Sequence, residues 1–190
     1  MENPTAPDAP RVLTAPDHYW EDLRAEDRLV SPGLTITESH LVSWAGLTLD
    51  NVALHLDAEH AAGTSFGQRI GHGPLTLSAA LGLMTQTGYF SRVVAWLGLD
   101  AVRALRPVHI GDTIRAEARV AVARETRKPE QGVWSLEYSV LNQRDEPVMT
   151  FTSSFLMQRR PAGSATTGTA ATGPAAAART STPSTPSTGA

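Results

Sequence analysis

The stretch IGHGPLTLSAALGLMT, residues 70–85, decides the fold of this 190-residue chain. The segment 71–73, Gly-His-Gly, comes directly before Pro74, and proline is favoured at the first position of a helix. The residues that follow are apolar on nearly every side, which is typical of a buried helix rather than of one on a surface. The sequence therefore predicts a central helix from Pro74 to Met84.

The second half of the chain changes from a helical repeat to alternation. Apolar residues recur at every second position in 114–122, 134–140 and 149–157, and the intervening segments 127–132 and 142–147 are rich in turn formers. Alternation of this kind predicts an antiparallel meander with one buried face and one wet face. Helices followed by such a sheet predict an α+β fold in which the sheet curls around the central helix.

Further elements are expected before and between these segments. Thr37 has a side chain preferred at an N-cap, and apolar residues recur after it as far as Leu47. A third short helix is expected over residues 92–97, and residues 29–36 are expected to supply another strand.

The composition divides the chain into three parts. Residues 1–16 are rich in proline, and residues 161–190 contain no Leu, Ile, Val, Phe, Tyr or Trp. Such segments cannot bury enough apolar surface to offset the entropy of ordering them. We expect both to be disordered, with one domain over residues 17–160.

Charge and residue usage exclude several classes of function. The chain has 16 Lys and Arg against 19 Asp and Glu, a formal net charge of -3. A mildly acidic chain is a poor partner for nucleic acid or for an anionic membrane. It has no cysteine, so disulfides and thiolate metal sites are excluded. No signal peptide or long apolar run is found, and we expect a cytoplasmic location.

Three groups are suited to proton chemistry next to a carbonyl. Asp50 and His55 lie in the segment LDNVALHLD, residues 49–57, and Gly73 stands at the start of the central helix. A carboxylate and an imidazole exchange protons, and a free N–H at a helix start stabilises a developing oxyanion. By itself the spacing of Asp50 and His55 also fits a turn aspartate and a loop histidine.

The chain resembles the MaoC-like dehydratases, a family that includes the (R)-specific enoyl-CoA hydratases. The resemblance covers most of residues 19–157 and implies the hotdog fold, a curved antiparallel sheet wrapped around a long central helix. The residues that carry it are 19–23, 31–33, 35–38, 44–48, 50–55, 66–67, 70–73 and 106–112.

The resemblance also implies a reaction and roles for the three groups. Asp50 and His55 would activate the water that adds reversibly to a trans-2-enoyl thioester, giving a 3-hydroxyacyl thioester. The Gly73 N–H would receive the thioester oxygen. No metal or redox cofactor is implied, and coenzyme A enters only as part of the substrate.

Some positions depart from the family pattern Asp-x-Asn-Pro-x-His. Val52 and Ala53 stand where the family has Asn and Pro, and Leu81 stands where some members have a serine. These departures make the site less polar. We expect His72, Leu77 and Leu81 to contact the substrate, with the two leucines lining an acyl tunnel.

We expect a homodimer that binds an acyl-CoA or an acyl-carrier thioester. A single copy of this fold leaves a sheet edge and a substrate crevice open, and pairing two sheets edge to edge closes both. Two alternatives remain open. A hotdog thioesterase is one, although such enzymes often carry a carboxylate on the central helix and residues 75–88 contain none. A non-catalytic acyl-thioester-binding or partner subunit is the other, motivated by Val52, Ala53 and Leu81.

Overall fold

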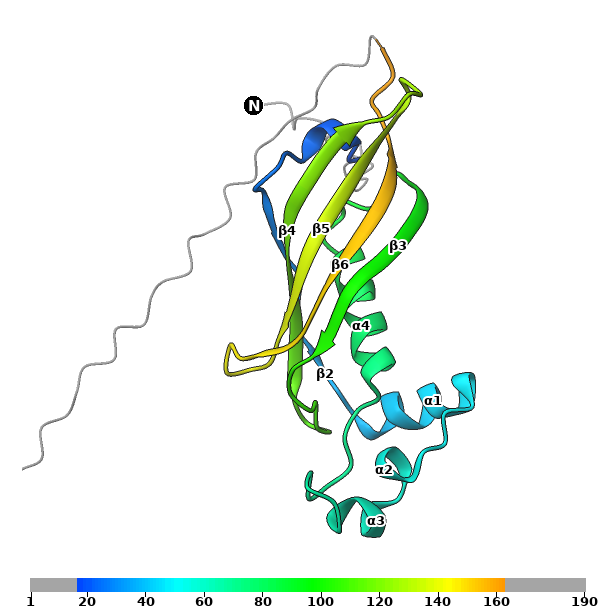
Figure 1. Ribbon diagram of the computed structural model, residues 1–190, viewed down its shortest axis with the longest axis vertical. Helices are drawn as coiled ribbons and strands as arrows, with labels where there is room; N and C mark the ends of the chain where they lie inside the picture. Colours follow the sequence, from blue (N-terminus) through cyan, green and yellow to red (C-terminus); the bar gives the residue numbers. More distant parts are fainter. Residues whose placement is uncertain (1–16, 163–190) are drawn as a thin grey trace, which may run out of the picture.

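The computed structural model describes residues 17–162. One long helix, α4, lies against one face of a sheet of long strands, and three shorter helices project beyond the end of the sheet where α4 begins (Figure 1). The elements in chain order are η1 (Trp20–Asp22), β1 (Arg28–Val30), β2 (Leu34–Thr35), α1 (Glu38–Thr48), α2 (Ala53–Leu56), α3 (Ala58–Ala62), α4 (Gly73–Thr85), β3 (Val93–Ala104), β4 (Thr113–Glu125), β5 (Gln131–Leu141) and β6 (Pro147–Gln158).

The sheet is antiparallel at every pairing among these strands, in the order β1-β4-β5-β6-β3, with β2 also pairing with β4. Strands β4, β5 and β6 are joined as successive hairpins, which confirms the predicted meander and the α+β class. Strand β3 forms one edge of the sheet, so its outer hydrogen-bonding groups have no strand partner within residues 17–162.

The core lies between α4 and the inner face of the sheet. Alternate residues of the long strands point inward and are buried, whereas their neighbours, such as Arg115 and Glu137, lie on the outer face. The helix contributes Leu75, Ala80, Leu83 and Met84 to the same core. Buried strand residues include Ile114, Ala116, Ala118, Val120, Trp134, Leu136, Val140, Met149, Phe151 and Met157.

The central helix is confirmed, but it is buried on one side only. Pro74 stands in the first turn as predicted, whereas Ser78 and Gly82 are exposed. The sheet of a single chain covers one face of α4, so the apolar character of the opposite face has no explanation within one copy.

Two predictions about secondary structure need correction. Residues 92–97 do not form a helix, and strand β3 begins at Val93, because the β-branched and aromatic side chains there favour a strand and β6 offers a partner. Residues 29–36 form two short strands instead of one, since Pro32 lies between them and cannot donate to the ladder. Thr37 is the N-cap of α1, as predicted.

One close approach anchors the start of the domain. Trp20 packs so tightly on β5 that a Cβ at Gly132 would lie 2.4 Å from the indole ring. Only glycine therefore fits at this position. The Trp20 indole N–H donates to the Val133 carbonyl, and the Trp134 indole N–H donates to the Trp20 carbonyl.

The expectations of disorder concern residues 1–16 and 161–190, which lie outside the described part of the chain except for 161 and 162. The division into parts therefore stays a prediction. Within residues 17–162, every helix is too short or too polar to cross a membrane.

Leu136 gives a direct test of the core. Its side chain is 0% exposed at the centre of the sheet, whereas the Leu47 side chain on α1 is 80% exposed. We expect Leu136→Ala to lower the free energy of unfolding by about 2–5 kcal/mol, because the substitution leaves a cavity. Leu47→Ala should change it by less than about 0.5 kcal/mol. Urea titration followed by tryptophan fluorescence measures both, and equal losses would contradict the assignment of the core.

Candidate active site

The segment that carries Asp50 follows a tight helix end. Leu49 caps α1 in a left-handed conformation, with φ of 63°, and its N–H donates to the Ala45 carbonyl. The chain turns sharply there, so that the half-buried Asp50 lies next to the start of α4. His55 is also half-buried, but it lies in the short helix α2 and not in a loop as the sequence suggested.

A backbone carbonyl fixes the tautomer of His55. Its Nδ1 lies 2.8 Å from the Ile70 carbonyl oxygen. A carbonyl only accepts, so Nδ1 must carry the proton, and Nε2 of the neutral ring keeps its lone pair. His55 is therefore held in the form that can take a proton at Nε2.

His72 lies directly behind this pair. Its side chain is fully buried, its ring stacks on that of His55 with centroids 3.8 Å apart, and its Nε2 lies 3.1 Å from the carbonyl oxygen of Asp50. One ligand atom from each of Asp50, His55 and His72 lies within 4.8 Å of the other two. The structure thus brings these three predicted residues together, but places His72 behind the site and not on the lining of the neighbouring hollow.

By residue type, an aspartate and two histidines are donors that a metal ion accepts. The arrangement of the rings does not favour one. The two imidazoles stack at an interplanar angle of 30°, so their in-plane lone pairs run side by side and do not converge. One nitrogen of each ring also lies against a backbone carbonyl. The geometry favours proton transfer over metal binding.

Gly73 supplies the third group. It is the first residue of α4, and His72 is the N-cap. The N–H of a first helical residue has no partner within the helix, and the positive end of the helix dipole lies beside it. A Cβ at Gly73 would meet nothing within 4 Å, and Gly73 lines an open hollow.

Two hollows lie along α4 on the side of β3. The first, about 290 Å³, is lined by His55, Gly73 and Thr76 together with the end of β3 and the segment that follows it. The second, about 320 Å³, is lined almost entirely by apolar groups, including Leu81. Gly73 and Leu81 are eight residues apart, which is about 12 Å along a helix. Leu77 is half-buried between them but lines neither hollow.

Sequence patterns did not reveal the walls of the second hollow. Phe90, Trp96, Tyr138 and Phe155 come from separate segments and meet only in the folded chain. Burial raises the pKa of the Tyr138 hydroxyl, which therefore stays neutral, and its oxygen has no hydrogen-bond partner within residues 17–162. The second hollow thus suits an apolar tail.

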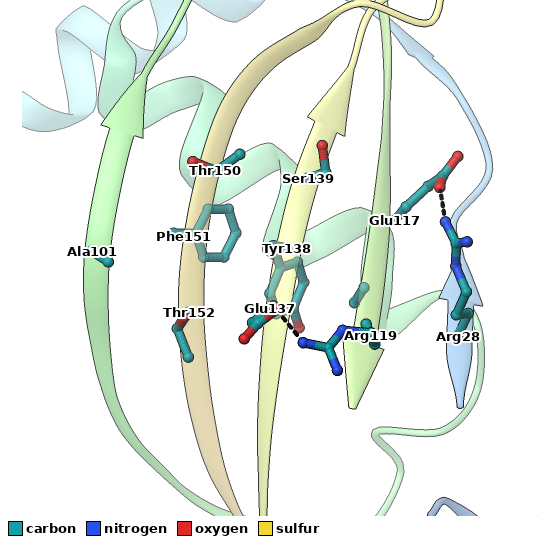
Figure 2. Close-up of a pocket in the computed structure, with 11 residues that line it drawn as sticks. Arg28, Ala101, Glu117, Arg119, Glu137, Tyr138, Ser139, Thr150, Phe151 and Thr152 are labelled. Carbon is teal, nitrogen blue, oxygen red and sulfur yellow. Dashed lines mark hydrogen bonds and ion pairs between the residues drawn. The ribbon is translucent and has the colours of Figure 1, made fainter. Parts of the chain in front are cut away.

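A third and larger hollow, about 500 Å³, lies on the outer face of the sheet (Figure 2). Its charged side chains are paired with each other. Arg28 binds Glu117 at 2.9 Å and Arg119 binds Glu137 at 2.6 Å, as Figure 2 shows. Because these charges already neutralise one another, whereas a carboxylate, an imidazole and a free helix N–H come together at the start of α4, we place the site at the start of α4.

The segment 70–71 is itself held by the turn after β3. The Gly71 N–H donates to the Val108 carbonyl at 2.7 Å, and Ile70 forms a bridge with His109. Asp112 closes this turn by accepting the His109 N–H at 2.8 Å and a Gln143 amide N–H at 2.7 Å. Burial acts to raise the pKa of Asp112, but hydrogen bonds from Gln143 and His109 outweigh it, so the pKa is lowered.

Comparison with known proteins agrees with a sheet wrapped on one helix. A Mycobacterium tuberculosis protein described as having a double hotdogfold aligns with a TM-score of 0.70 at 22% identity, over 78% of this chain and 46% of that chain. The fold is thus a hotdog, as expected. A family model described as "MaoC like domain" matches residues 23–140, and the chain belongs to this family of dehydratases.

Individual relatives agree. The solved structure described as monoamine oxidase regulatory protein from Archaeoglobus fulgius is 37% identical, with a TM-score of 0.72, and is matched over its whole length by 78% of this chain. "Protein MaoC" of Klebsiella aerogenes is 37% identical over 110 residues, which are 58% of this chain but only 32% of that protein. An "(R)-specific enoyl-CoA hydratase" of Rhodospirillum rubrum is 36% identical over 106 residues, 54% of this chain and 69% of the relative.

The turn closed by Asp112 predicts a pH-dependent contribution to stability. Because the pKa of Asp112 is lower in the folded protein, its contribution is present above the unfolded pKa of about 3.9 and is lost as the pH falls through the folded value. We expect Asp112→Asn to cost about 1 kcal/mol at pH 7, and the difference from wild type to shrink as the pH falls towards 3.

Urea titrations of both proteins at a series of pH values measure this difference. Asp145→Asn is the matched control, since the Asp145 carboxylate is mostly exposed and its exposed ion pair contributes less than about 1 kcal/mol. A difference for Asp112→Asn that is independent of pH would show that the carboxylate charge does not stabilise the turn.

Proposed function

We propose that this chain is a hydro-lyase that reversibly hydrates a trans-2-enoyl thioester to a 3-hydroxyacyl thioester. The observation that carries the proposal is the meeting of three groups at the start of α4. Asp50 and His55 lie side by side, and His55 shares one hollow with Gly73. The name of the Rhodospirillum rubrum relative, an (R)-specific enoyl-CoA hydratase, supports the same class of reaction.

The three groups divide the chemistry. A water held between the Asp50 carboxylate and Nε2 of His55 gives up one proton to this pair as its oxygen bonds to the β-carbon. The electrons of the double bond move to the thioester oxygen, where the Gly73 N–H stabilises the enolate. The α-carbon then takes a proton back from the pair, and the hydroxyl keeps the second proton of the water. The reverse sequence eliminates water.

The thioester would lie along α4. Its reacting end would occupy the first hollow and its acyl tail the apolar hollow beside Leu81. The candidates for the phosphates of coenzyme A or of a carrier are Arg69, Arg92, Arg103 and Arg106. Arg69 is bound by both oxygens of Glu38, and Arg92 is paired with Asp17. Arg106 lines the first hollow and is the better placed of these to meet a phosphate.

No resident cofactor is part of this proposal, because the thioester itself supplies the electron sink. The cytoplasmic location also stays a proposal. Leu81 and the replacement of the family asparagine by Val52 leave few polar groups around the reacting atoms, so water must be held by Asp50 and His55 themselves.

Hydration of crotonyl-CoA tests the proposed function. We expect Asp50→Asn and His55→Gln each to lower kcat by about 10²- to 10⁴-fold, because each removes one proton-transfer group. His60→Gln is the matched control, since His60 is exposed in the neighbouring helix α3. Loss of the absorbance of the conjugated enoyl thioester measures the rate.

The same assay separates the alternatives. Release of free thiol from acyl-CoA without hydration of the enoyl group would indicate a thioesterase instead. Tight binding of acyl-CoA without turnover would indicate a binding or partner subunit. Hydration that is unchanged in both variants would contradict the roles given to Asp50 and His55.

We also propose that two copies pair along β3. This edge strand exposes apolar side chains on both of its faces, including Val94, Trp96 and Leu97. A second copy would cover them, complete the hydrogen bonding of the edge and close the hollows beneath β3. The acyl-binding site would then be walled by both subunits.

Val94→Asp is expected to convert the dimer to a monomer, because it buries a charge in the proposed interface. Val30→Asp is the matched control. Val30 is similarly exposed, 56% against 49% for Val94, but lies on β1 at the opposite edge of the sheet. Sedimentation equilibrium measures the mass of each variant, with circular dichroism to check folding. A folded Val94→Asp dimer would place the interface elsewhere.

A further inference from the structure

We infer that His72 is a positioning residue that holds the Asp50 loop and the His55 ring in register with the Gly73 N–H. The inference deepens the proposed function and rests on it for its catalytic consequence. Its structural content is separate, namely that a bond from the buried imidazole to the backbone of Asp50 keeps this loop ordered.

The burial of His72 is the first observation. It is 0% exposed and belongs to a small set of polar residues buried in the described chain. A buried imidazole is costly unless its polar atoms find partners. The Nε2 atom has one, the carbonyl oxygen of Asp50 at 3.1 Å, whereas Nδ1 has none within residues 17–162. Since a carbonyl only accepts, Nε2 must donate its proton, and the neutral ring carries its lone pair on Nδ1.

The second observation is how few other bonds hold the loop. The Asp50 N–H lies 3.4 Å from the Thr48 hydroxyl, and the Asn51 N–H donates to the Leu49 carbonyl at 3.1 Å. Both bonds are local. The bond from His72 joins Asp50 to a residue 22 positions away, and it fixes the loop against the start of α4.

The third observation is that one short segment holds all three catalytic groups. Ile70 accepts the Nδ1 proton of His55, His72 holds the backbone of Asp50, and Gly73 carries the oxyanion donor. The stacked rings of His55 and His72, with centroids 3.8 Å apart, add a direct contact between α2 and the segment 70–73. Residues 70–73 are therefore a common frame for the site.

The sequence of the loop makes this bond more important. Position 52 is a valine whose side chain is 56% exposed, where the family pattern has an asparagine. The Val52 side chain cannot form a hydrogen bond within the loop. Within residues 49–52 of the described chain, the bond from His72 is the long-range hydrogen bond that fixes the loop, while the bond from His55 to Ile70 holds α2. Misplacement of a catalytic group by about 1 Å is enough to cost about 100-fold in rate.

Two substitutions separate the bond from the shape of the ring. His72→Phe keeps a flat ring that can stack on His55 but removes the donor. His72→Gln loses the ring but carries an amide N–H that can reach the Asp50 carbonyl. Ser31→Ala is the control for a buried hydrogen bond lost elsewhere, because Ser31 Oγ accepts the Ala116 N–H at 2.9 Å far from the loop.

Hydrogen exchange of the full chain, read peptide by peptide, tests the structural content without any substrate. We expect His72→Phe to speed amide exchange in residues 49–56 by about tenfold or more while the exchange of β4 and β5 stays slow. His72→Gln should restore slow exchange in 49–56. Ser31→Ala should leave 49–56 unchanged. Exchange in 49–56 that is the same in His72→Phe and wild type would overturn the inference, as would equal loosening in the Phe and Gln variants.

Steady-state kinetics tests the catalytic consequence. We expect His72→Phe to lower kcat for crotonyl-CoA by about 10- to 100-fold with KM changed by less than about threefold, since the hollows are intact. His72→Gln should recover most of kcat. Were the wild type inactive on every thioester, the proposed function would fail while the exchange result still decided the role of His72. Were the wild type active and His72→Phe equally active, the positioning role would fail alone.

Discussion

The segment 70–73, which leads into α4 at Gly73, is the constraint on which the rest of the structure depends. The segment is pinned from one side by the Gly71 N–H bond to Val108 and from the other by the packing of Leu75 into the core. A helix that begins at a fixed place presents its free N–H groups at a fixed place. The Asp50 loop and α2 are then attached to the same segment through carbonyl–imidazole contacts. Residues 70–73 therefore join the packed core to the residues of the proposed site.

Charge is distributed differently on the two faces of the sheet. The outer face carries arginines and carboxylates joined in pairs, such as Arg115 with Asp145 and Arg119 with Glu26. The inner side, near α4, is mostly apolar. Electrostatic interactions are stronger in such surroundings because little water screens them.

The edge strand β3 connects the proposed site with the proposed dimer interface. It covers both hollows from one side and leaves its outer edge open. Its register with β6 shifts at three places, and Ala101 adopts a left-handed φ of 51°. Such irregularities bend a strand and increase its local twist. A partner copy that pairs with this strand would have to follow the same bend, and the hollows of both copies would be shaped by it.

The amino-acid pattern alone was enough for the class of fold, the meander of β4 to β6, the central helix with Pro74 in its first turn and the grouping of Asp50 with His55. These features follow from local rules, since periodicity sets which face of an element is buried and proline sets where a helix can start. Strand β3 could not be predicted, because a short apolar run fits a helix as well as a strand until β6 is there to pair with it. The burial of His72, the stack on His55 and the bond to Asp50 were also hidden from the sequence. The stack and the bond join positions 17 and 22 residues apart. Only the packing of α4 against the sheet brings such positions within reach of one another.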